Sequence, residues 1–575
     1  MKKCSNLLNN KMRILTYIIL LIISLQVNGQ DYGAISGNLQ KNYQTFNEDI
    51  KIGAEDYPGY TSGYLNLIYN YKKIIIGTRL EMYHNTPPGS GLEQYEGSGI
   101  PYRFIQYKSE IFDITAGNFY DEFGNGLIFK TYFDPSLGVD NSMNGLRLKF
   151  TPFQGLYITA LSGKQRNAWD INSNNFIKKT GYMSDENNRL HGLVSAFNAD
   201  LSLNEVLLKQ WNTYINVGAS FVTKNESDNN AIYYVPENVG AFNSRINISK
   251  GNMAINIDYA TKINDPSSDN NFTYNNGNGL IATTTYSQKG LGVSAGIKRI
   301  QNMSFRSNRT GQFQEFNINY ITPFTKQQAY SLATIYPYTS QPNGEMGSQI
   351  DIYYKIPKKT KLGGKYGTYI SFNFSNSFEI HKTAIDSTID VDQRGTLGYN
   401  SSFLKIGENK LFQEINLEIS RKINRNLKFI GTYIHVINND KILVSQPILE
   451  NQEHEIINAN IFILESLIRM PSKGSLKKSM RTEIQHLHTK QHFGNWAMGL
   501  IEYKISKWFF SFQDMYNYGH PEKPHYYSIS SGYNKGTNRF ALTYGKQRKG
   551  LFCVGGVCRE VPASNGFAIS ITSSF

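Results

Sequence analysis

The sequence predicts an all-β fold, a single large transmembrane antiparallel β-barrel of about 22 to 26 strands. Apolar and polar residues alternate with a period of two along many segments, and these segments are about ten residues long, enough to cross a bilayer when tilted. Their connections alternate between short turns and long polar loops. After residue 29 no apolar run is long enough for a membrane helix, so any spanning has to be by strands.

The N-terminus predicts a secretory signal peptide over residues 1–29, which leaves 30–575 as one barrel domain. Lys11 and Arg13 precede the apolar run Ile14–Leu25, and small residues come before Gln30. About a dozen apolar residues are too few to span a bilayer, where roughly 20 are needed. Met12 also gives a normal start for this signal. The mature chain is therefore expected to be exported.

The alternation is clear in three segments. Apolar residues between Met253 and Tyr259 occupy one face of a strand, with polar or small residues on the other. The same pattern recurs between Leu411 and Ile419 and between Ile370 and Phe374. A soluble sandwich would alternate too, so strand length and connections are needed to favour the barrel.

The connections favour a membrane barrel. Short turns at Tyr71–Lys73, Ser249–Asn252 and Lys504–Lys507 contrast with long polar stretches such as Asn376–Gly407. Hydrocarbon offers no partner to backbone N–H or C=O groups, so spanning strands must close into a ring. A single chain with both termini on one side needs an even number of strands.

The C-terminal segment FAISITSSF predicts the closing strand, with Phe567, Ile569 and Ile571 on one face and Phe575 as the last residue. Counting backwards through alternating segments to Tyr32 gives roughly 26 strands. The four segments before the closing strand are Asn538–Gln547, Tyr526–Tyr533, Trp508–Tyr516 and Trp496–Ile505.

A barrel this wide is not filled by its own inward side chains. Two segments are long enough to fold into the lumen: Tyr120–Asn141, and the stretch from Lys298 to a strand expected near Gln312. Each is either an ordinary external loop or a constriction or ligand shelf inside the barrel.

Cys553 and Cys558 flank Gly555-Gly556 in the loop before the closing strand. In a hairpin turning at the two glycines, which tolerate positive φ, the cysteines face each other about 4.5 Å apart at Cα. A metal would want two further ligands, and a redox pair is more often C-x-x-C. An external structural disulfide is therefore predicted in this exported chain.

Other motifs carry little chemistry. His486 and His488 share a strand face and could bind a metal, and His492 follows in the loop. The sequence does not place a third ligand beside the first two, so solvated histidines are favoured. Asp258–Asn271 and Ser184–Asn188 are rich in acids and amides yet lack the spacing of a calcium loop, so solvated loops are favoured. No Ser/His or Asp/His constellation is placed, so we expect no enzyme activity, catalytic residue, metal or cofactor.

The formal net charge of +14 fits contact with an anionic lipid or polysaccharide surface. The alternative is that this charge carries no information about a binding partner. Nucleic acid is excluded as a partner because the compartment is wrong and the charges are scattered. The C-terminal strand that ends on Phe575 resembles the terminal signature of bacterial outer-membrane proteins, which the barrel-assembly machinery reads. This resemblance implies outer-membrane lipid and, during biogenesis, that machinery as partners.

Several stretches resemble an outer-membrane barrel family of Bacteroidota with no assigned activity. They are the segment TAGNFYDEFGNGLIFKTYFDPSLGVDNSMNGLRLKF, the stretches NMSFRSNRTG and ITPFTKQQAYSLATIYPYTSQPNGEMG, and the tail GLFCVGGVCREVPASNG. The resemblance implies fold and outer-membrane location, and nothing about substrate. A fainter likeness is to barrels of capsule assembly and polysaccharide export.

Two functions follow as hypotheses. The first is a porin-like channel whose lumen is constricted by Tyr120–Asn141. The second is a structural or assembly barrel that docks partner proteins or surface polysaccharide through aromatic external loops such as Tyr336–Glu345.

Overall fold

The computed structural model describes residues 33–90, 92–166, 192–227, 230–311, 315–443, 454–471, 476–492, 494–554 and 557–575. The predicted signal peptide lies outside these residues. No helix in the described part of the chain is long and apolar enough to cross a membrane.

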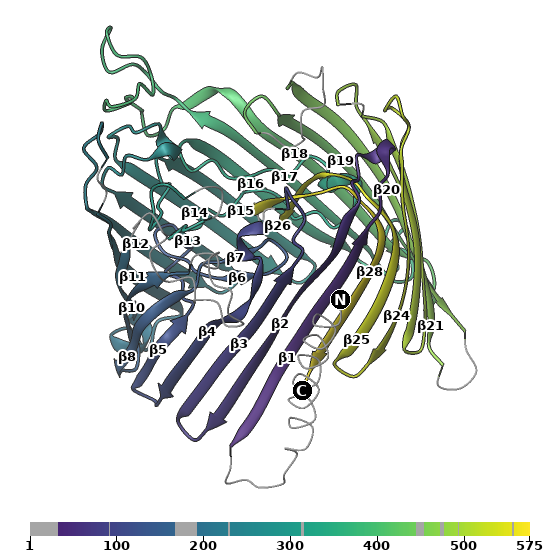
Figure 1. Cartoon of the computed structure of the whole chain (residues 1–575), viewed down its shortest axis with the longest axis horizontal. Coiled ribbons are helices and arrows are strands. Elements are labelled where there is room, and N and C mark those ends of the chain that lie inside the picture. Colours follow the sequence, from purple (N-terminus) through teal and green to yellow (C-terminus); the bar gives the residue numbers. More distant parts are fainter. Residues whose placement is uncertain are drawn as a thin grey trace, which may run out of the picture.

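The described residues form one closed antiparallel sheet of 24 strands (Figure 1). Neighbours in the sequence are neighbours in the barrel, and the ring closes where β1 pairs with β28, with Gln40 opposite Thr572. The number is even and falls within the predicted range of 22 to 26; the direct count of roughly 26 exceeds it by two. Alternation and length do not distinguish a strand of the wall from chain inside the lumen.

The wall strands of the first half are β1 (Ala34–Phe46), β2 (Tyr57–Tyr71), β3 (Ile74–His84), β4 (Gly97–Lys108), β5 (Phe112–Phe119), β8 (Met143–Phe153), β9 (Leu156–Gln165), β10 (Leu193–Ser202), β11 (Thr213–Asn225), β12 (Asn238–Lys250), β13 (Met253–Lys262) and β14 (Gly277–Gln288). Those of the second half are β15 (Leu291–Gln301), β16 (Glu345–Ile356), β17 (Thr368–Ile380), β18 (Ile406–Lys422), β19 (Leu427–Asn439), β20 (Ile456–Met470), β21 (Lys478–His488), β22 (Trp496–Ile505), β23 (Trp508–Asn517), β24 (His525–Lys535), β25 (Asn538–Gln547) and β28 (Ser564–Ser574).

Two short hairpins stand apart from the wall. They are β6 (Phe133–Asp134) with β7 (Val139–Asp140), and β26 (Gly550–Val554) with β27 (Val557–Val561). The helical turns are α2 (Leu203–Val206), η1 (Ile50–Ile52), η2 (Glu93–Tyr95), η3 (Ser268–Asn270) and η4 (Leu332–Thr334).

The predicted alternation of short turns and long loops is confirmed, although the loop predicted at Asn376–Gly407 is shorter, because both of its ends belong to strands. Lys72-Lys73 alone joins β2 to β3, and Ser506-Lys507 joins β22 to β23, whereas residues 381–405 form the long loop between β17 and β18. Ser506 has φ 54°, the left-handed conformation that lets so short a turn follow the twist of its strands. The two-residue turns between neighbouring wall strands therefore lie at one end of the barrel, the short-turn end, and the longest loops lie at the other.

The outer face of the wall carries a continuous apolar band. Ile501, Phe512 and Ile529 are direct cross-strand partners on β22, β23 and β24, and each side chain is about half exposed. On the neighbouring strands Leu464 pairs with Ile484, which is 65% exposed. A soluble protein rarely exposes so extended an apolar surface, so this band is the face that meets lipid.

Candidate functional site: a partly plugged lumen

The first of the two segments that are long enough to fold inward lies inside the barrel. After β5 ends at Phe119, the chain turns inward, and Phe123, Leu127, Ile128 and Phe129 are almost fully buried. They pack against small and branched residues on the inner face of the wall, including Val194, Val222, Val239, Ala241 and Ala260. Tyr120–Asn141 is therefore not an ordinary external loop but lies inside the barrel.

The second segment, residues 302–311 and 315–344, continues the same internal structure. Its backbone joins the first segment, since Lys130 N donates to Ile318 O at 2.8 Å and Tyr320 N donates to Gly126 O at 3.0 Å. Further along it crosses to the opposite wall, where Leu332 N donates to Gln485 Oε1 at 2.9 Å. We call residues 120–142, 302–311 and 315–344 together the plug.

Two expectations about this region are corrected. No strand of the wall begins near Gln312: among the described residues after β15, the next wall strand starts at Glu345. The aromatic stretch Tyr336–Glu345, expected as an external loop, lies inside, with Tyr336 and Tyr338 buried against β18 to β23. Local alternation is the same for a strand in lipid and for chain packed on the inner wall, so the sequence did not separate them.

An ion network connects the plug to the wall. We call it the latch; it comprises Arg79 and Glu81 on β3, Arg166 just after β9, and Asp140 on β7 of the plug. The Asp140 carboxylate accepts hydrogen bonds from both guanidinium groups and from Tyr120 Oη at 2.8 Å. Arg166 Nη2 also reaches Glu81 Oε2 at 2.9 Å. All four side chains are buried, so the latch joins two separate stretches of wall through one plug carboxylate.

The charges of the latch are mutually compensated. Burial by itself would raise the pKa of Asp140, but Arg166 and Arg79 outweigh it and hold that pKa below its usual value. Burial likewise opposes the charge of Arg166, yet Glu81 and Asp140 raise its pKa well above normal. Both groups therefore stay ionised, and each depends on its partners.

A second buried ion cluster comes from the segment Asp258–Asn271, for which solvated loop was the favoured interpretation. Asp265 is buried and binds Lys224 Nζ at 2.8 Å and Arg309 Nε at 2.9 Å. Lys224 lies on β11 and Arg309 in the plug, so the partners are far apart in the sequence. The acids of this segment bind the plug, so the favoured interpretation of the segment as a solvated loop is wrong. The other such segment, Ser184–Asn188, lies outside the described residues.

Cys553 and Cys558 form a disulfide, with Val554 opposite Val557 in the hairpin register and 4.1 Å between the cysteine Cα atoms. The turn at Gly555-Gly556 lies outside the described residues. The hairpin folds back over the plug beside β6 and β7 (Figure 1), where Arg559 Nε donates to Ser136 O at 2.6 Å. The disulfide therefore stiffens the β26–β27 hairpin, which lies over the plug at the long-loop end.

The plug does not fill the whole lumen. The inner faces of β24, β25, β28, β1 and β2, here called the polar wall, carry small polar side chains such as Ser530, Thr543, Ser570 and Gln40. These are partly exposed although the barrel closes around them. On the opposite side, Ser375 of β17 has no exposed surface. Water therefore reaches the polar wall, whereas the plug covers the inner face of β17 at Ser375.

The histidines have separate partners. His486 Nε2 lies 2.8 Å from Tyr518 Oη and His488 Nδ1 lies 2.9 Å from Asn495 Oδ1, whereas His492 approaches Asp440 at 3.4 Å. Within the described ranges, no group of three or more His, Cys, Asp or Glu side chains is arranged to hold a metal ion.

Comparison with known proteins gives the following likenesses. No curated protein sequence matches the chain. The siderophore receptor PirA from Pseudomonas aeruginosa is 8% identical, with 95% of this chain and 81% of that chain covered and a TM-score of 0.38. The outer membrane protein OprD from Pseudomonas aeruginosa is 11% identical, with 86% and 98% covered and a TM-score of 0.33. OccD3 from the same organism is 14% identical, with 76% and 93% covered and a TM-score of 0.37. These likenesses are too distant to support a statement about function.

A family model matches almost the whole length of the chain, from residue 9 to residue 575, and so includes every strand of the wall and both segments of the plug. The chain belongs to the family of unknown function DUF6029.

Proposed function

We propose that this barrel is a porin-like channel of the outer membrane whose solutes move along the polar wall, past the plug. The observation that carries the proposal is the unequal burial of the inner face. Small polar residues of β24 to β2 remain partly exposed inside a closed ring, while those facing the plug are buried. Water beside the polar wall provides a path for hydrophilic solutes.

The chemistry of the polar wall suits passage rather than tight binding. Ser530 and Thr543 are linked hydroxyl to hydroxyl at 2.8 Å, and Tyr64 Oη donates to Gln40 Oε1 at 2.9 Å. These groups are uncharged and already hydrogen-bonded to each other, so they offer weak, exchangeable contacts to a passing solute. No second function is proposed, because the aromatic loop that suggested docking of a partner is buried inside the barrel.

Conductance of the purified protein in planar bilayers tests the proposal. We expect discrete conductance steps that shrink in Ser570→Trp, since Ser570 lies on the inner face of β28 and a bulky ring there narrows the path. The matched control is Ile571→Trp, the next residue, which faces lipid and is 37% exposed. Electrical silence of the wild type, or a Ser570→Trp channel that conducts like the wild type, would overturn the proposal.

A further inference from the structure

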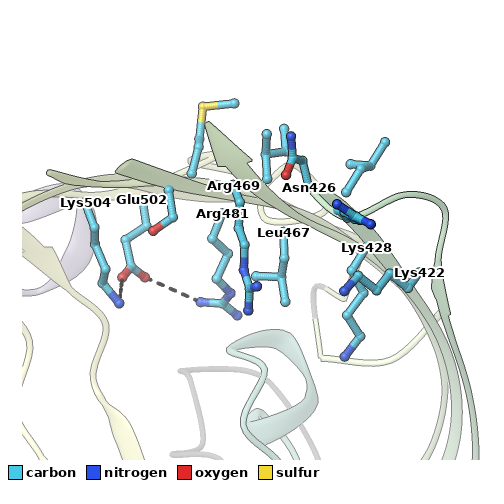
Figure 2. Close-up of a pocket in the computed structure, with 13 residues that line it drawn as sticks. Lys422, Asn426, Lys428, Leu467, Arg469, Arg481, Glu502 and Lys504 are labelled. Carbon is cyan, nitrogen blue, oxygen red and sulfur yellow. Dashed lines mark ion pairs between the residues drawn. The ribbon is translucent and has the colours of Figure 1, made fainter. Parts of the chain in front are cut away.

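A cavity of about 380 Å³ lies at the short-turn end of the barrel, lined by residues of β18 to β22 and the turns between them. Its lining includes six cations and one carboxylate. The cations are Lys422, Arg425, Lys428, Arg469, Arg481 and Lys504, and the carboxylate is Glu502. Figure 2 shows Arg481, Glu502 and Lys504 projecting from the same side of the sheet.

Five of these cations form a row, one on each of five neighbouring strands, which we call the basic ladder: Lys422 on β18, Lys428 on β19, Arg469 on β20, Arg481 on β21 and Lys504 on β22. Lys422 pairs directly with Lys428 in the register, and Arg481 pairs with Glu502, two residues before Lys504. With neighbouring strands about 4.8 Å apart, the row is roughly 19 Å long.

The basic ladder faces the lumen. Arg481 shares its strand face with Glu483 and Gln485, and Gln485 accepts a hydrogen bond from the plug at Leu332 N. Ile484, which is on the other face of β21, is 65% exposed on the lipid side. A ligand must therefore enter from water, and lipid headgroups of the surrounding bilayer do not reach the row from its outer face.

The charges of the row are only partly compensated. Arg481 binds Glu465 at 3.0 Å and also Glu483, and Lys504 binds Glu502 at 2.6 Å. Lys422, Lys428 and Arg469 pair with no acid among the residues that the structure describes. Three neighbouring cations without carboxylate partners repel one another, and an anion lying along them relieves that repulsion.

We propose that the basic ladder binds an extended soluble polyanion, a chain that carries carboxylates or phosphates at intervals of roughly 5 Å, the spacing of the strands. One cation on each strand matches a linear ligand better than a single compact anion. The guanidinium of Arg469 supplies a planar fork for an oxyanion, and the lysines supply point charges on either side of a repeat. The ladder lies on β18 to β22, outside the polar wall, so this inference goes beyond the proposed channel, and binding does not require that the channel conducts.

Calorimetric titration of the detergent-solubilised full chain tests this. The probes are hexaglutamate, a short linear polyphosphate and neutral maltohexaose. We expect both polyanions to bind and maltohexaose not to bind. The triple variant Lys422→Gln, Lys428→Gln, Arg469→Gln is expected to weaken hexaglutamate binding by about tenfold or more.

The matched control removes the same charge elsewhere at the short-turn end, with Lys250→Gln, Lys289→Gln and Lys535→Gln; all three lysines are exposed. We expect its affinity for hexaglutamate to stay within about twofold of the wild type. Equal losses in both triple variants, or a wild type that binds neither polyanion, would overturn the site. A wild type that conducts without binding hexaglutamate refutes the ladder and leaves the channel standing. A wild type that binds hexaglutamate but is electrically silent supports the ladder and refutes the channel.

Discussion

Replacing Asp140 with asparagine tests whether the latch fixes the plug to the wall. The carboxylate is shared by Arg79 and Arg166, and it also accepts from Tyr120 Oη and from Ser142 N at 3.0 Å. Asparagine has nearly the same shape but no charge. In Asp140→Asn, both buried guanidinium groups therefore lose a carboxylate partner, and Glu81 remains beside each of them.

Removing one partner of a buried ion pair typically costs about 3–5 kcal/mol, because the remaining charge is left uncompensated in a dry environment. The contrast is Glu122→Gln in the same plug segment. Its carboxylate binds Lys130 Nζ at 3.1 Å, but both side chains are partly exposed, and such pairs contribute about 0–1 kcal/mol. We therefore expect Asp140→Asn to lower the free energy of unfolding by at least a few kcal/mol more than Glu122→Gln does.

The free energy of unfolding in detergent, followed by tryptophan fluorescence against denaturant, measures this difference. Single-channel recording of the same proteins gives a second readout. The wall strands are hydrogen-bonded to one another around the whole ring. Asp140→Asn is therefore expected to keep the barrel assembled, to loosen the plug and to increase conductance. Equal stability and equal conductance of Asp140→Asn and Glu122→Gln would refute the view that the latch holds the plug.

Three further predictions concern pH, solvent access and the disulfide. The pKa of Asp140 is lowered in the folded protein, so its stabilising contribution is complete above the unfolded value of about 3.9 and is lost as the pH falls through the folded value. Wild-type conductance should therefore rise on acidification below about pH 3.9, an increase that Asp140→Asn should not show. Ser570→Cys on the polar wall should react with a small charged thiol reagent in the folded protein, and Ser375→Cys on the plugged side should not; equal labelling would contradict the partition of the lumen. Titration of the untreated mature protein should find no free thiol at Cys553 and Cys558, and replacing both with serine should cost less than about 3 kcal/mol, since the closed loop is short and the hairpin lies outside the 24-stranded sheet.

The sequence was most informative where a residue's surroundings are set by its neighbours in the chain. The strands Asn538–Gln547 and Trp496–Ile505 have the predicted bounds, and the closing strand has Phe567 and Ile571 on its lipid face. The opposition of Cys553 and Cys558 also follows from local spacing, because a two-residue turn fixes the cross-strand register.

The candidate site was mostly beyond reach of the sequence. The latch gathers Glu81, Asp140 and Arg166 from positions up to 85 residues apart, and Asp265 meets Lys224 and Arg309 over a similar span. Nothing in the local pattern marks Asp140 as a buried charge, since acids are equally common in external loops. One available signal was the apolar run Leu127–Phe129, which is too apolar for a loop in water.

The amino-acid sequence by itself thus determined a closed antiparallel barrel with an even number of strands, because a period-two pattern in lipid leaves no other way to satisfy the backbone. Only the tertiary structure decided which part of the lumen is plugged, which part is wet, and where the cations of five strands align. Those properties depend on which inner faces meet across the ring, and that follows from closure and register rather than from any short stretch of chain.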